Sequence, residues 1–81
     1  MKSVDRIEFY EKLSECKSKS EIESLIDIID NDDLRSIILD KYNQIIEFNK
    51  DKNDGTLVKD IIKILEFTYL KFEKSMNEEN N

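Results

Sequence analysis

The chain has 81 residues, 40% of them charged and 38% hydrophobic, and its formal net charge is −6 at pH 7. A chain of this length forms one small domain and leaves little room for a deep substrate pocket. It contains no histidine, a single cysteine, Cys16, and a single glycine. The sequence therefore lacks the commonest general base, a zinc-binding cysteine cluster and a glycine-rich phosphate loop. We expect a non-enzymatic cytoplasmic protein with no cofactor and no metal.

Four amphipathic segments follow one another along the chain, and the second is short. Residues 4–17 carry apolar side chains at helical spacing, with Ser3 as the expected N-cap. Residues 21–30 form the second segment, where Ser20 and Glu23 fit a capping box. Both segments are predicted to be helices, and the second needs tertiary packing to persist.

The third and fourth segments are longer. Residues 33–48 carry an apolar stripe, with Asp32 as the expected N-cap, and residues 57–76 carry another, with Thr56 as the expected cap. The predicted core positions of these two helices are Leu34, Ile37, Ile38, Tyr42, Ile45, Ile46, Val58, Ile61, Ile62, Leu65, Tyr69 and Phe72.

No segment alternates apolar and polar residues for long enough to predict a strand. The fold class that we expect is all-α, a small compact bundle of about four amphipathic helices. Residues 1–76 form its single domain, and residues 77–81 are expected to be a polar, frayed tail. No apolar run approaches the roughly 18 residues that would indicate a membrane span.

Acidic residues are concentrated in one quarter of the chain. Residues 21–40 carry seven acids and one base, so this block accounts for the whole net charge of −6. Some of these acids are explained by a favourable interaction with a helix N-terminus. Together they also form a candidate acidic face that would attract a basic partner. Its predicted residues are Glu23, Asp27, Asp30, Asp32, Asp33 and Asp40.

A second candidate surface lies on the last helix. Phe67 and Leu70 fall away from its apolar stripe, and their spacing of three makes them neighbours on the helix surface. Polar residues surround them, so they are candidates for a partner anchor or for the face of a homodimer. The alternative is that a second layer of the bundle covers them.

A weaker candidate is the loop before the last helix, where residues 51–57 resemble part of an EF-hand calcium loop. The match is incomplete, because Gly55 falls at position five instead of six when Asp51 is counted as position one. If one residue is treated as deleted, Ile61 falls where the bidentate glutamate belongs. A turn built from residues that tolerate unusual backbone angles explains the same composition.

These observations favour a small regulator or inhibitor that binds a protein with a basic surface, for example a nucleic-acid-handling enzyme, and acts by occlusion. Direct nucleic-acid binding is disfavoured because the chain is acidic and has no basic run. In size and charge alone, the chain is similar to nuclease and bacteriocin immunity proteins and to phage-encoded inhibitors of host enzymes. Two alternatives stay open, a structural helical subunit or homodimer and a calcium-responsive module.

Overall fold

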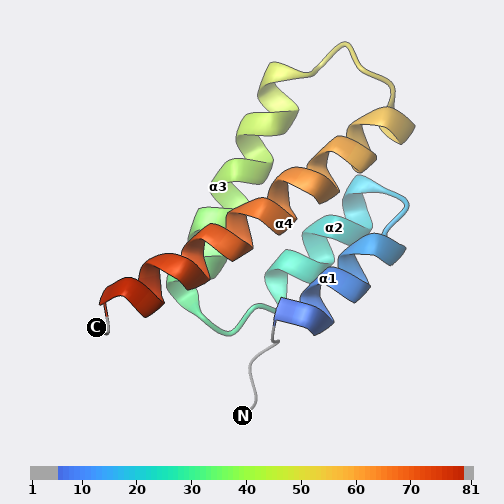
Figure 1. Ribbon diagram of the computed structural model, residues 1–81. Coiled ribbons are helices and arrows are strands. Elements are labelled where there is room, and N and C mark those ends of the chain that lie inside the picture. The colour runs from blue at the N-terminus through green and yellow to red at the C-terminus, as the bar shows by residue number, and fades with distance from the viewer. Residues whose placement is uncertain (1–5, 80–81) are drawn as a thin grey trace.

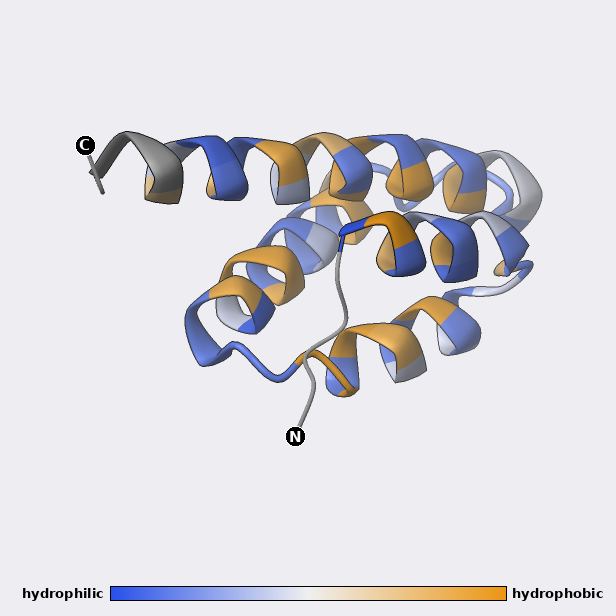
Figure 2. Ribbon diagram, turned by 60° about the horizontal axis from the view of Figure 1, so that its bottom comes forward, coloured by the Kyte–Doolittle hydropathy of each residue, from blue (hydrophilic) through white to orange (hydrophobic). Residues whose placement is uncertain are grey.

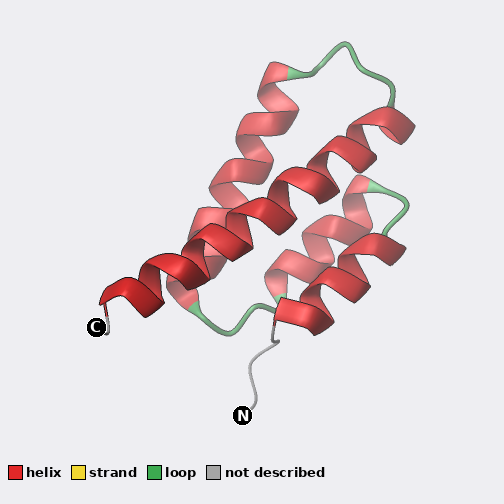
Figure 3. Ribbon diagram, viewed as in Figure 1, coloured by secondary structure: helices red, strands yellow, loops and turns green. Residues whose placement is uncertain are grey.

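The computed structural model describes residues 6–79, with their side chains as far as residue 76, and consists of helices joined by short loops (Figures 1 and 3). The four helices are α1 (Arg6–Glu15), α2 (Lys19–Asp27), α3 (Asp32–Phe48) and α4 (Asp54–Glu79). No strand occurs within residues 6–79, and the predicted all-α fold is confirmed. The expected cap at Ser3 lies outside the described residues.

The helices form two antiparallel pairs, α1 with α2 and α3 with α4 (Figure 1). Helix α1 contacts α2 and α4, α2 also contacts α3, and the contact between α3 and α4 is the most extensive. The four helices thus enclose one core, toward which their apolar residues turn (Figure 2). Each helix contributes fully buried side chains, among them Phe9, Leu13, Ile22, Ile38, Ile61 and Leu65.

Helix α4 runs the length of the molecule. Its 26 residues, at about 1.5 Å each, span about 39 Å, close to the longest extent of 43 Å. Two polar contacts join α1 to α4. Arg6 Nε lies 2.7 Å from Glu73 Oε1, and the Tyr10 hydroxyl donates to the Glu66 carbonyl at 2.7 Å. Since exposed ion pairs contribute about 0–1 kcal/mol, the core supplies most of the stability.

The N-terminus of α2 lies two residues earlier than predicted. The Ser18 hydroxyl accepts a hydrogen bond from the Glu21 amide at 3.3 Å, and the Glu21 carboxylate accepts one from the Lys17 amide. The predicted capping box of Ser20 and Glu23 is therefore wrong, and Ser18 and Glu21 form the capping box instead. Both pairs have the spacing of a capping box, and tertiary packing selects the earlier one.

Helices α3 and α4 also begin before their predicted starts. Asn31 Oδ1 accepts from the Leu34 amide at 3.0 Å, so Asn31 is the cap and Asp32 is the first helical residue. Asn53 Oδ1 accepts from the Thr56 amide at 2.9 Å, which makes Thr56 part of the first turn of α4. Asn, Asp, Ser and Thr all cap well, so residue type alone does not choose among adjacent candidates.

The predicted end of α3 at Phe48 is confirmed, while the other three predicted C-terminal boundaries differ from the structure by two or three residues. Helix α1 ends at Glu15 and α2 at Asp27, where the chain turns so that Ile29 can enter the core. Helix α4 continues to Glu79, beyond the predicted end at residue 76. No described helix is both long and apolar enough to cross a membrane.

Candidate partner-binding surfaces

Two of the six acidic candidates share a recess between α2 and α3. Glu23 and Asp27 lie one turn apart on α2 and border a depression of about 390 Å³. Leu39, Tyr42 and Asn43 line it from α3. Leu39 is 43% exposed, and no basic side chain is among the described residues that line the depression. An accessible apolar side chain therefore shares this recess with two acidic residues, and none of the described residues that line it is a lysine or an arginine.

Tyr42 positions one of these carboxylates, although the sequence marked it only as a core residue. Its ring is 2% exposed, while its hydroxyl donates a hydrogen bond to Glu23 Oε2 at 2.6 Å. Burial raises the pKa of Tyr42 well above its usual value, and the hydrogen bond to Glu23 raises it further. The neutral hydroxyl thus holds the Glu23 carboxylate at the edge of the depression. Helical periodicity identifies the buried ring but does not identify this cross-helix bond.

Asp40 lies on the outer side of α3, directly after Leu39. Gln44 Nε2 donates to its Oδ2 at 3.1 Å. Asp33 and Glu47 stand seven residues before and after Asp40, so the three carboxylates lie along one line of the helix surface. Glu47 lies 3.3 Å from Lys50, which offsets part of its charge. Glu47 is not among the acidic residues predicted from the sequence. Its spacing of seven residues from Asp40 places it on the same side of the helix and would have identified it.

The remaining acids lie elsewhere. Asp32 pairs with Arg35 in the first turn of α3, and Arg35 also donates to the Ile29 carbonyl at 2.6 Å. Asp30 borders a separate recess of about 180 Å³ between the α2–α3 loop and α4, together with Glu73. Glu23, Asp27 and Leu39 line the recess between α2 and α3, and Asp40 follows Leu39 on the surface of α3 outside that recess. These four residues are here called the acidic α2–α3 face.

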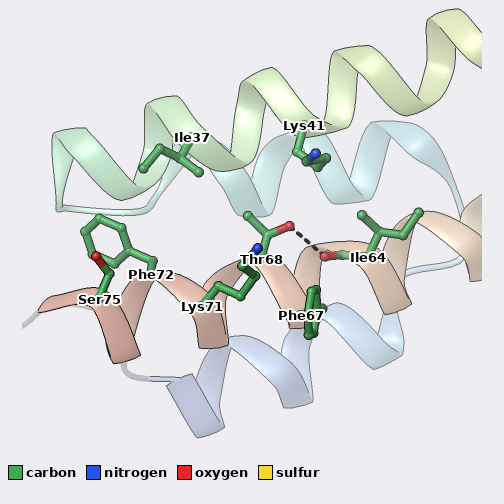
Figure 4. A pocket seen from close by; sticks show the side chains of 8 residues that line it. All are labelled: Ile37, Lys41, Ile64, Phe67, Thr68, Lys71, Phe72 and Ser75. Atoms are coloured by element: carbon green, nitrogen blue, oxygen red, sulfur yellow. Dashed lines mark hydrogen bonds between the residues drawn. The ribbon is translucent and has the colours of Figure 1, made fainter. Parts of the chain in front are cut away.

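A longer apolar recess lies between α3 and α4. Two adjoining depressions, of about 380 and 400 Å³, share Ile37, Phe72 and Ser75 and so form one continuous furrow. Figure 4 shows Ile37 and Lys41 on α3 facing the side chains of α4 across it. Ile37 is 44% exposed, although the sequence placed it in the core stripe. We call this recess the α3–α4 furrow, and its lining residues are Asp33, Ser36, Ile37, Lys41, Ile64, Phe67, Thr68, Lys71, Phe72, Ser75 and Met76.

The two apolar candidates of the last helix are placed differently. Phe67 lines the furrow and is 60% exposed, and the Lys71 ammonium lies 5.6 Å from the centre of its ring. Leu70 is partly buried and does not line the furrow. The sequence therefore located the exposed aromatic, while its apolar neighbours in space are Ile37, Ile64 and Phe72 instead of Leu70.

The remaining chemical candidates show no assembled site. Asp54 belongs to the first turn of α4, Asn53 is occupied as its cap, and Lys52 lies 2.7 Å from Asp60, so the loop does not gather oxygen ligands. No cluster of three potential metal ligands occurs in the described part of the chain. Cys16 is partly buried, and burial raises the pKa of its thiol above the usual value.

Comparisons with known proteins add no family to this geometry. Neither the models of known protein families, nor the curated proteins, nor the solved structures contain a match to this chain. A functional proposal therefore rests on the two surfaces themselves.

Proposed function

We propose that this protein is a non-enzymatic regulator that binds a partner protein with a basic surface through the acidic α2–α3 face. The observation that carries the proposal is the accessible Leu39 in the same depression as the Glu23 and Asp27 side chains. Partner sites commonly combine a central apolar contact with a charged rim. Here the rim has one sign, which selects for positive charge on the partner.

The bond from Tyr42 supports this proposal energetically. A flexible glutamate loses side-chain entropy when a partner immobilises it, by roughly 0.5–1.5 kcal/mol. Glu23 already accepts the Tyr42 hydroxyl at 2.6 Å, so part of that ordering is present before binding. The carboxylates also create a negative field that accelerates encounter with a basic surface. Occlusion of a groove that otherwise holds nucleic acid is the mode of action that such a field favours.

The test is a charge reversal at Asp27 and Asp40, both of which are exposed. The double variant Asp27→Lys/Asp40→Lys should lose a basic protein that the unmodified protein captures from the source lysate. Quantitative mass spectrometry at low and moderate salt measures the retention, and the purified captured protein is then titrated directly. The matched control reverses Glu11 and Glu15, which are exposed on α1.

The control alters the net charge by the same amount and should leave capture intact. Loss of binding by at least about tenfold in the first variant alone would support the proposal, since reversal replaces attraction by repulsion at two sites. An equal loss in the two variants would show that only total charge matters, and full retention by both would show that neither pair of charges matters for binding. Either result would remove the acidic α2–α3 face as the binding surface.

A further inference from the structure

We infer that the α3–α4 furrow is a second docking site, and that its occupant is an acidic amphipathic helix of a partner protein. This inference goes beyond the proposed function, which uses the other side of α3. The furrow lies between two antiparallel helices (Figure 4). Its two depressions share Ile37 and Phe72 and are therefore continuous. Such a groove suits the apolar face of a docked helix, whose anchors recur at i, i+3 or i+4, and i+7.

The floor of the furrow presents apolar groups. Ile37, Ile64 and Phe67 are exposed, and Phe72 is partly buried. The hydroxyl of Thr68, a buried polar residue that lines the furrow, donates to the Ile64 carbonyl at 2.8 Å. Because that donor is satisfied within α4, an apolar side chain can cover it without leaving a hydrogen bond unmade.

The charges at the rim define the partner. Lys41 rises from α3 and Lys71 from α4, and neither forms an ion pair with any carboxylate of the described residues. Lys63 and Lys74, both exposed, stand four residues before and seven after Phe67, so they extend the basic rim along α4. Among the described residues that line the furrow, the one acid is Asp33, at its far end. In a protein of net charge −6, this local excess of lysine favours an occupant with acidic flanks.

Charge decides against a second copy of the chain as the occupant, and the shape of the recess decides against a membrane. A symmetric contact between two copies uses the same patch on both, so it would place the lysine rim of one copy against that of the other. Lysines around an exposed phenylalanine also suit an anionic membrane, but a recess between helices exposes less apolar surface to a flat bilayer than a protruding edge would. Both alternatives become outcomes of the test.

The experiment uses two synthetic helical peptides with the same leucine pattern, one with glutamate flanks and one with lysine flanks. Fluorescence anisotropy measures their binding to the full chain at low and moderate salt. We expect the acidic peptide to bind more tightly by on the order of tenfold at low salt. Its glutamates attract Lys41 and Lys71, whereas the lysines of the other peptide repel them. The double variant Lys41→Glu/Lys71→Glu should reverse the preference.

A matched control, Lys17→Glu/Lys59→Glu, makes the same change in net charge at exposed lysines that do not line the furrow. It should keep the preference for the acidic peptide. Absence of binding by either peptide, or an equal loss in both double variants, would overturn the inference. So would association of the protein with itself, or with vesicles of phosphatidylcholine and phosphatidylserine, in place of peptide binding.

Failure of this test leaves the acidic α2–α3 face untouched, because no substituted residue belongs to it. Conversely, Asp27→Lys/Asp40→Lys should retain the acidic peptide if the two docking sites are separate. The two proposals therefore fail or survive independently of each other.

Discussion

The two sides of α3 carry opposite charge although one helix builds both. Toward α2, Leu39 faces Glu23 and Asp27. Toward α4, Ile37 lies beside Lys41 and Lys71. The net charge of the chain conceals this division, because a total of −6 describes neither surface. The two proposals together describe a protein that holds a basic partner and an acidic segment at the same time, and they fit an adaptor as well as an inhibitor.

The largest expected effect comes from comparing adjacent isoleucines of α3. Ile38 is fully buried, whereas Ile37 is 44% exposed in the furrow. Ile38→Ala should lower the free energy of unfolding by about 2–5 kcal/mol, because it removes buried methyl groups and leaves a cavity beneath both surfaces. Ile37→Ala should cost less than about 1 kcal/mol and weaken only peptide binding in the furrow. Urea denaturation followed by circular dichroism measures both, and similar losses would show that the furrow is part of the core.

That comparison also shows where the sequence was informative. The helical period correctly placed Ile38, Ile61 and Leu65 in the core, since a 3.6-residue repeat identifies the buried side of each helix. It misplaced Ile37, which lies at the border of the stripe. Whether a border position is covered depends on how closely α3 and α4 approach, and one helix read alone carries no information about that distance.

The candidate surfaces were predictable only in part, for the same reason. The count of charges located the acidic block of residues 21–40. The packing of the helices determines that Glu23 and Asp27 line the same recess as Leu39, while Asp30 borders a recess at α4. The lysine rim joins Lys41 to Lys71, which are thirty positions apart, and no local pattern links them. Phe67 was identified because its exposure follows from its own position on one helix.

An intermediate effect is expected from Tyr42, which lies beneath the acidic side. Tyr42→Phe removes the bond to Glu23 and should cost about 1 kcal/mol at pH 7, since the exposed carboxylate can be solvated again. The folded-state pKa of Tyr42 is raised, so its contribution is complete below the ordinary value near 10 and is lost as the pH rises above it.

The difference in stability between the unmodified protein and Tyr42→Phe should therefore narrow at about pH 11. Urea denaturation at both pH values measures it. A double-mutant cycle with Glu23→Ala serves as the control, because it isolates the contribution of the bond itself. A difference that stays constant with pH would show that Tyr42 ionises as easily in the folded state as in the unfolded one.

The smallest effect on stability is expected from Phe67, the exposed aromatic of the furrow. Phe67→Ala should change the free energy of unfolding by less than about 1 kcal/mol, because the ring loses only partial burial and an exposed contact with Lys71. Alanine is also the better helix former, which offsets part of that loss. In the anisotropy assay with the acidic peptide, the same variant should weaken binding by on the order of tenfold, as expected for an aromatic anchor.

The relation between these two measurements separates a binding residue from a folding residue. A large loss of stability would mean that Phe67 helps to close the bundle, and its exposure would then be incidental. Unchanged stability with unchanged peptide binding would remove the aromatic anchor from the furrow and leave only its lysines. Unchanged stability with weakened binding would show that Phe67 acts in partner binding and not in folding. The α3–α4 furrow would then be a binding site for an acidic partner, which the negative net charge of the chain does not predict.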